Sequence, residues 1–141
     1  MNISQKIGDT EIERNLAATK KLFAAFGAKD IPGIVKFLHP EIIIEFYGPP
    51  VIPYAGIYRG PEKCRGFFER VLSSVEVCQF DAEEFISERD KVVVTGHLNL
   101  TAIATGRTID SDFVHVITLK DGKWLRFRDF MNTAVAVAAF S

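Results

Sequence analysis

The most constraining feature of this sequence is a pair of alternating segments between Arg107 and Asn132, joined at Asp121-Gly122. An Asp-Gly pair supplies the positive φ angles that a tight hairpin needs, so the pattern predicts two antiparallel strands. Successive side chains of a strand point to opposite faces. One row of the first strand holds Ile109, Ser111, Phe113, His115, Ile117 and Leu119, and one row of the second holds Leu125, Phe127, Asp129 and Met131.

His115 and Asp129 are the titratable groups of these two otherwise mostly apolar rows. With Asp121-Gly122 at the centre of the turn, the residues opposite Asp129 fall between Phe113 and His115, which brings the pair within reach. A carboxylate is costly to bury unless it is paired or lines a cavity, so Asp129 is a candidate acid or base. His115 is either its partner or a core histidine bonded to the backbone, and the pattern leaves both interpretations open.

Length and charge bound the class of protein. The 141 residues predict a single domain over residues 1–141. Lys and Arg total 17 against 18 Asp and Glu, and the basic residues are scattered, so we expect no binding to nucleic acid or to anionic membranes. The first 15 residues, MNISQKIGDTEIERN, lack the apolar core of a signal peptide, and no apolar run approaches the roughly 20 residues of a membrane span. We expect a cytoplasmic protein.

The cysteines and histidines do not follow metal-binding spacings. Cys64 and Cys78 are too few for a disulfide scaffold, and we expect both to be reduced and half-buried. His39, His97 and His115 do not form a zinc pattern. The sequence therefore predicts no metal site and no cofactor.

Three helices are predicted in the first half of the chain. A capping-box spacing and helical periodicity predict the first over residues 10–26. Asp30 and Pro32 begin a short second helix that ends before Pro40, and Gly60-Pro61 opens the third.

Strands make up most of the remainder. They are predicted over residues 41–47, 76–88, 92–103, 107–119 and 124–131, with Cys78, Phe80, Ala82 and Ile86 sharing one face of the second. Helices followed by a long antiparallel meander predict an α+β fold in which the sheet curls around the helices. Such a sheet encloses a cone, which is a natural small-molecule pocket.

The segment 48–60, GPPVIPYAGIYRG, is rich in proline and glycine and predicts no regular element. It carries more apolar side chains than a solvated loop needs, among them Val51, Ile52 and Tyr54. We interpret it either as a lid packed over the pocket mouth or as a dimer contact.

Three passages carry a family resemblance over about residues 11–139: FAAFGAKDIPGIVKFLHP, YRGPEKCRGFF and HVITLKDGKWLRFRDFMNT. They resemble the SnoaL-like polyketide cyclases of the NTF2-like superfamily, which are relatives of ketosteroid isomerase and limonene-epoxide hydrolase. The resemblance implies an NTF2-like cone, in which three helices of the N-terminal half pack on a strongly curved, mixed, mostly antiparallel sheet, with a short C-terminal helix.

The resemblance also implies roles for individual residues. The polyketide cyclases place an acid/base aspartate on the last strand and a histidine on the preceding strand, where this chain has Asp129 and His115. The base of ketosteroid isomerase falls at Phe46, so that route lacks its carboxylate. The epoxide hydrolases add an arginine and an aspartate from the middle strand, which here offers His97 and Asn99.

Several function classes remain open from the sequence. The first is an enzyme that moves a proton next to a carbonyl of an apolar, polyketide- or steroid-like substrate, with Asp129 as base and then acid. His115, Tyr54 or Tyr58 would hydrogen-bond the oxygen that gains charge. The others are a binding protein for a small hydrophobic ligand, an epoxide hydrolase with an altered site, and an interaction module. Predicted substrate contacts are Phe46, Tyr54, Tyr58, Phe113, Phe127, Met131, His97 and Asn99.

The other face of the last strand carries Trp124, Arg126, Arg128 and Phe130. An exposed row of aromatic and arginine side chains is typical of an interface. We therefore expect a homodimer formed sheet against sheet, unless the third helix or residues 133–140 cover this row within one chain.

Overall fold

The structure, a computed structural model, describes residues 3–141, with side chains from residue 10 onward. The elements follow in the order α1 (Ile3–Gly27), α2 (Ile31–Val35), β1 (Leu38–Phe46), β2 (Gly56–Arg59), α3 (Pro61–Ser74), β3 (Val75–Glu88), β4 (Lys91–Ala102), β5 (Thr108–Lys120), β6 (Lys123–Met131) and α4 (Thr133–Phe140).

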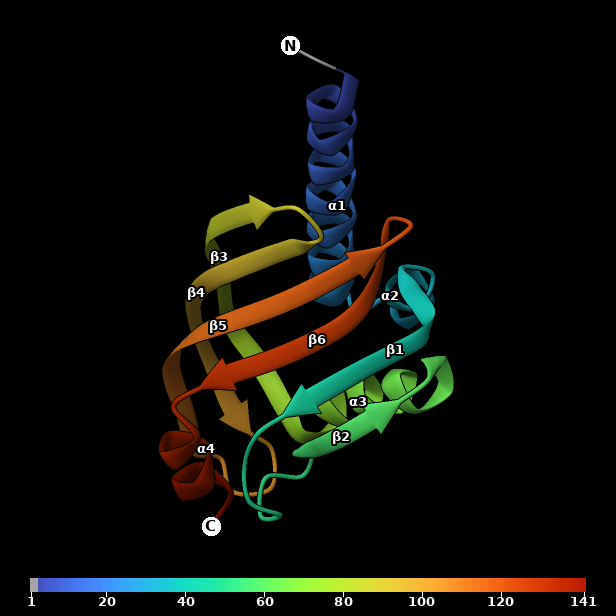
Figure 1. Cartoon of the computed structure of the whole chain (residues 1–141). Coiled ribbons are helices and arrows are strands. Elements are labelled where there is room, and N and C mark those ends of the chain that lie inside the picture. The colour runs from blue at the N-terminus through green and yellow to red at the C-terminus, as the bar shows by residue number, and fades with distance from the viewer. Residues whose placement is uncertain (1–2) are drawn as a thin grey trace.

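The strands form one six-stranded sheet in the order β2-β1-β6-β5-β4-β3. The contact between β1 and β6 is parallel, and all the other pairs are antiparallel. The sheet curls strongly, and α1, α2 and α3 lie on its concave side, while α4 follows the end of β6 (Figure 1). This arrangement confirms the predicted α+β cone with a mixed, mostly antiparallel sheet and a short C-terminal helix.

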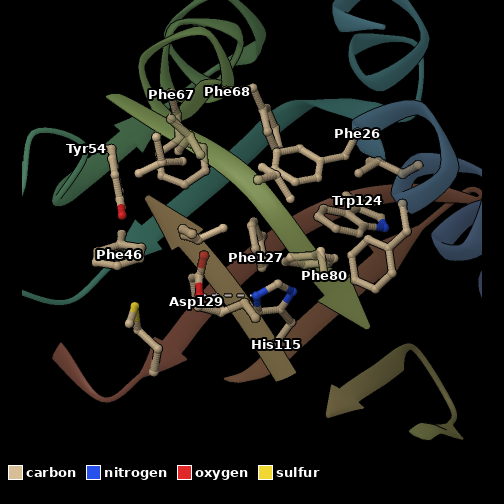
Figure 2. Close-up of a pocket in the computed structure, with 18 residues that line it drawn as sticks. Phe26, Phe46, Tyr54, Phe67, Phe68, Phe80, His115, Trp124, Phe127 and Asp129 are labelled. Atoms are coloured by element: carbon tan, nitrogen blue, oxygen red, sulfur yellow. Dashed lines mark ion pairs between the residues drawn. The ribbon is translucent and has the colours of Figure 1, made fainter. Parts of the chain in front are cut away.

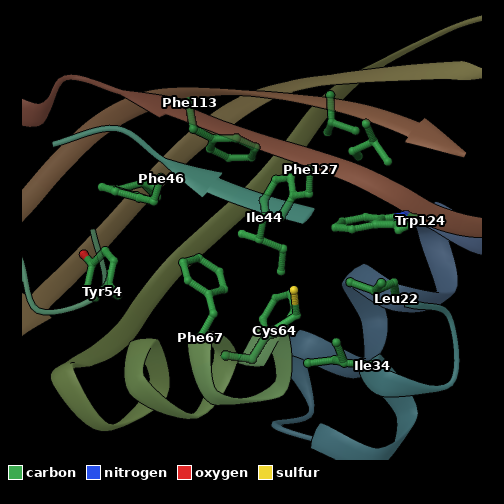
Figure 3. Close-up of a cluster of buried hydrophobic side chains, with 14 of the residues drawn as sticks. Leu22, Ile34, Ile44, Phe46, Tyr54, Cys64, Phe67, Phe113, Trp124 and Phe127 are labelled. Atoms are coloured by element: carbon green, nitrogen blue, oxygen red, sulfur yellow. The ribbon is translucent and has the colours of Figure 1, made fainter. Parts of the chain in front are cut away.

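The hydrophobic core fills the space between the concave face and the helices. Buried side chains from α1, α2 and α3 meet Ile44, Phe46 and Phe127 of the central strands (Figure 3). Trp124 is fully buried among them, and its Nε1–H donates to Thr19 Oγ1 of α1 at 3.3 Å. Within the described part of the chain, no helix combines the length and apolar character needed to cross a bilayer.

Several predicted boundaries are confirmed and others are wrong. Asp121 and Gly122 have φ values of 55° and 73°, as the predicted hairpin requires, and the Asp30 side chain accepts from the Gly33 N–H at the start of α2. However, α1 begins at Ile3, so the helix continues through Gly8 and starts seven residues before the predicted position. The segment predicted to lack regular structure contains β2, which pairs with β1.

Irregular strand pairing overturns part of the predicted face assignment. Trp124 pairs with Leu119 but Arg126 pairs with Thr118. At this point β6 therefore advances by two residues while β5 advances by one. Such a bulge moves a side chain to the other face. Trp124 therefore points into the cone, against the prediction, whereas Arg126 and Phe130 are exposed on the convex face as predicted.

Two irregularities in β3, between Val77 and Gln79 and between Ala82 and Glu84, have the same effect. Cys78 and Ile86 are exposed, against the prediction that they share the inner face with Phe80. Cys64 is fully buried, so neither cysteine is half-buried as expected; both are free thiols.

Candidate active site

His115 of β5 and Asp129 of β6 lie directly opposite each other in the sheet. Their Nε2 and Oδ1 atoms are 3.2 Å apart, so the two side chains form a close pair on the concave face, at ion-pair distance. The His115 side chain is 5% exposed and that of Asp129 is 16% exposed. The carboxylate is therefore the more accessible member of the pair.

A cavity of about 60 Å³ lies in front of this pair. Its wall is almost entirely aromatic and aliphatic, and Figure 2 shows His115 and Asp129 on one side of it, with Tyr54, Phe67 and Phe68 opposite. The lining residues are Leu22, Phe23, Phe26, Phe46, Tyr54, Phe67, Phe68, Val71, Val75, Val77, Phe80, Leu98, Leu100, His115, Trp124, Phe127, Asp129 and Met131.

The imidazole of His115 is held by phenylalanine rings. The ring centroids of Phe113 and Phe127 lie 4.4 Å and 4.8 Å from that of His115, and Phe23 and Phe80 lie 5.7 Å and 6.0 Å away. Its Nδ1 is buried and has no hydrogen-bond partner among the described residues. A buried polar atom without a partner is uncommon, and such atoms concentrate at functional sites.

Gly96 of β4 makes this packing possible. A Cβ atom at position 96 would lie 2.6 Å from the ring of Phe113, which stacks on Phe80 with 4.7 Å between centroids. Glycine thus lets the Phe113 ring lie flat against the sheet beside His115.

Tyr54 brings a hydroxyl group to the opposite wall. The residue is 3% exposed and its ring packs edge-on against Phe46, with 5.0 Å between centroids. Burial raises the pKa of the Tyr54 phenol well above its ordinary value, and the negative charge of Asp129 adds to this shift. The hydroxyl therefore keeps its proton at neutral pH and can donate a hydrogen bond.

The structure brings most of the predicted contact residues together. Phe46, Tyr54, Phe127 and Met131 line the cavity with the pair. Phe113 lies behind His115 rather than on the cavity surface, as its stacking on Phe80 shows.

Tyr58 does not line the cavity, because its hydroxyl donates to the main-chain oxygen of Tyr54 at 3.0 Å. The segment 48–60 nevertheless covers part of the cavity through Tyr54, with Ile52 also buried. This burial agrees with the lid interpretation, whereas Val51 and Ile57 on the same segment are exposed.

His97 and Asn99 do not join the site, against the prediction. Both lie on the convex face of β4, while the alternate residues Leu98 and Leu100 line the cavity. His97 Nδ1 is 2.9 Å from Asp112 Oδ1, and its Nε2 contacts Asp110. These hydrogen bonds raise the pKa of the exposed imidazole, as expected for a solvated ion-pair cluster.

Sequence reasoning missed the helix side of the cavity. Leu22, Phe23 and Phe26 of α1 form one wall, and Phe67 and Phe68 of α3 another. The helical periodicity of these apolar residues was the available signal. It predicts a buried face but does not say which elements that face meets.

The described residues contain no cluster of three or more His, Cys, Asp or Glu side chains placed to hold a metal ion. The groups available for chemistry in the cavity are the His115–Asp129 pair and the Tyr54 hydroxyl.

Solved structures share this fold. An NTF2-like protein from Burkholderia xenovorans LB400 is 25% identical, with a TM-score of 0.85, over 92% of this chain and 98% of that one. TerC co-crystallised with polyporic acid is 28% identical, with a TM-score of 0.79, over 90% and 98%. A candidate SnoaL-like polyketide cyclase from Jannaschia sp. CCS1 is 21% identical, with a TM-score of 0.76, over 92% of each chain.

A family model of the SnoaL-like domain matches residues 19–127. The chain therefore belongs to the SnoaL-like domain family of the NTF2-like superfamily. No curated protein matches the chain.

Proposed function

We propose that the protein is an acid/base enzyme that moves a proton next to a carbonyl group of an apolar substrate. The observation that carries this proposal is the close pair of His115 and Asp129, whose Nε2 and Oδ1 atoms are 3.2 Å apart in the wall of a largely apolar cavity. Asp129 is the one acidic side chain among the described residues that line this cavity. The TerC relative, crystallised with the small molecule polyporic acid, supports a small-molecule ligand for this fold.

The first step is removal of a proton by Asp129. Its carboxylate takes the proton from the carbon next to the carbonyl, and the C–H electron pair forms the enolate while the carbonyl oxygen gains negative charge. The protonated Tyr54 hydroxyl donates a hydrogen bond to that oxygen. His115 positions Asp129 through the contact at Nε2.

The second step returns the proton from Asp129. If the proton goes to a different carbon of a conjugated enolate, the product is an isomer. If the enolate carbon first attacks a second carbonyl of the same substrate, a new C–C bond closes a ring and the proton goes to the resulting alkoxide. Both outcomes leave the molecular formula of the substrate unchanged, and both use the same base.

Deuterium exchange tests this proposal before any substrate is known. Apolar cyclic ketones incubated with the protein in D₂O are expected to lose the NMR signals of the protons next to the carbonyl faster than in buffer. The same protein after heat denaturation is the control, because it contains the same side chains without the cavity. The proposal is wrong if no ketone of the panel exchanges faster with the folded protein than with the denatured one.

A binding protein for a small hydrophobic ligand is the second candidate, and the apolar lining of the cavity supports it. Trp124 lines the cavity and is the chain's single tryptophan, so its fluorescence reports an occupied cavity. A ligand that changes this fluorescence without any catalysed exchange would favour binding alone.

The outward placement of His97 and Asn99 leaves the epoxide hydrolase alternative without its middle-strand groups.

We also propose that the protein forms a homodimer through the convex face of its sheet. Tyr47 and Phe130 are 43% and 38% exposed there, and their rings stack with 5.2 Å between centroids. Arg126 beside them bonds Glu45 through two nitrogens. Exposed aromatic and arginine side chains together are typical of protein interfaces. The same surface would therefore also suit a different protein as partner.

Phe130→Glu is expected to convert a dimer to a monomer, because the substitution places an unpaired carboxylate at the centre of the contact. Light scattering at micromolar concentration measures the mass of the parent and of the variant. Glu62→Phe, at an exposed position of α3, would be the control and should keep the parent mass. A monomer mass for the parent protein would end this proposal.

A further inference from the structure

A second hollow adjoins the cavity between α1 and β3. It has a volume of about 320 Å³ and is lined by the last turns of α1, by Leu72 of α3 and by the first half of β3. Phe23, Phe26, Val77 and Phe80 belong to the walls of both hollows. We call this second hollow the α1–β3 groove.

The central cavity is too small to hold a typical organic substrate. Ligand sites in proteins usually measure about 300–1,000 Å³, whereas the cavity has about 60 Å³. The α1–β3 groove supplies the missing room directly beside it. A substrate that reaches Asp129 therefore needs space on both sides of the shared wall.

In the part of the chain that the structure describes, the shared wall is closed by side-chain contacts and not by main-chain hydrogen bonds between α1 and β3. β3 is an edge strand that is hydrogen-bonded only to β4, and among the described residues no main-chain hydrogen bond joins it to α1. The two elements meet through half-buried aromatic side chains, whose rotation breaks no sheet pairing. The walls built by the central strands cannot separate in this way, because those strands are hydrogen-bonded on both sides.

Phe80 stands at the centre of this wall. One face of its ring stacks on Phe113, while Phe23 and Phe26 contact it from α1 with centroid distances of 6.0 Å and 5.4 Å. Figure 2 shows His115 beside Phe80. The irregularities of β3 on both sides of Phe80 direct its side chain inward.

Lys29 brings a positive charge to the lining of the groove. It has a φ of 56° just beyond the end of α1, and it is the one charged residue among the described residues that line the groove. An extended ligand that leaves the cavity past Phe80 meets this ammonium group.

We propose that the ligand is an elongated molecule with an apolar ring in the cavity, a chain in the α1–β3 groove and an anionic group at Lys29. Phe80 separates the two spaces and moves aside to admit the ligand. This inference rests on the proposed function for its ligand site, and it adds the shape and charge of the substrate.

Phenylalkanoic acids of increasing chain length, from phenylacetic to phenyloctanoic acid, test the groove. Binding is followed by the fluorescence of Trp124. The affinity is expected to rise by about two- to fourfold for each methylene that enters the groove, and then to level off. An affinity that does not depend on chain length, or no binding by any member, would overturn the inference.

Ala82→Phe fills the groove without touching the cavity, because Ala82 lines only the groove. The variant is expected to weaken phenyloctanoic acid at least tenfold and to leave phenylacetic acid unchanged. Gln79→Phe, at an exposed position of the same strand, is the matched control and should bind both acids like the parent. Ala24→Phe blocks the groove from the side of α1 and provides a second test if Ala82→Phe does not fold. Equal effects on short and long acids would contradict the inference.

Lys29→Met tests the anionic end. The variant is expected to weaken phenyloctanoic acid by about two- to fivefold, the range of an exposed ion pair, and to leave the matching alcohol unchanged. If the variant binds both the acid and the alcohol as the parent does, Lys29 does not bind an anionic group of the ligand. These readouts measure binding, whereas the proposed function is judged by proton exchange, so either can fail alone.

Discussion

Asp129→Asn is expected to slow the catalysed exchange of ketone protons by about 10²–10⁴-fold, the usual contribution of a general acid/base group. Asparagine has the shape of aspartate and keeps a polar atom beside His115 Nε2, so the fold and the cavity are expected to remain. The amide nitrogen and oxygen are not basic enough to take the proton. The exchange rate measured by NMR, beside the urea midpoint of parent and variant, separates loss of chemistry from loss of folding.

The chain offers a matched control for this substitution. Asp112 of β5 bonds His97 across the sheet, much as Asp129 bonds His115, but on the convex face. Asp112→Asn removes a carboxylate from an equivalent strand pair and should exchange protons at the parent rate. An Asp129→Asn variant that keeps more than about half of the parent activity would remove Asp129 from the role of base.

Trp124→Ala is expected to lower the free energy of unfolding by about 3–5 kcal/mol, because it leaves a cavity where a fully buried indole packs. The indole contacts Phe127 and Phe23, with centroid distances of 4.9 Å and 5.9 Å, and it also bonds Thr19. A loss of this size is a large part of the roughly 5–15 kcal/mol that stabilises a domain. Urea unfolding followed by circular dichroism measures it without the tryptophan signal.

Ile86→Ala is the control, because Ile86 of β3 is 55% exposed and lies outside the proposed dimer contact. Its cost should stay below about 1 kcal/mol, in line with partly exposed positions. Similar costs for the two variants would mean that Trp124 does not support the core. For the same reason Trp124→Glu is expected to unfold the chain rather than to separate subunits, since it would place an unpaired charge in the core.

The pairing of His115 with Asp129 could be predicted from the sequence because it depends on local chemistry. Asp121-Gly122 sets the turn, and a regular strand alternates its side chains, so counting outward from the turn brings the two residues opposite each other. The helix start at Gly60-Pro61 and the cap at Asp30 are local in the same way.

The alternation of side chains along β4 could have predicted that His97 and Asn99 lie outside the site. Leu98 and Leu100 are the apolar row of β4 and line the cavity, so their polar neighbours had to point outward. Placing His97 and Asn99 in the site followed the position of the strand in the related hydrolases and not the parity of its residues.

The sequence by itself determined the cone, the hairpin and the pair of titratable groups, because turns, caps and alternation act over a few residues. Only the tertiary structure decided that Trp124 faces inward, that Cys78 faces outward, and that α1 and β3 meet through aromatic rings. A single extra residue in a strand reverses the face of its neighbours, and the pattern of residues does not mark where it is inserted. The room in front of Asp129 depends on how those separate elements pack, which no local pattern specifies.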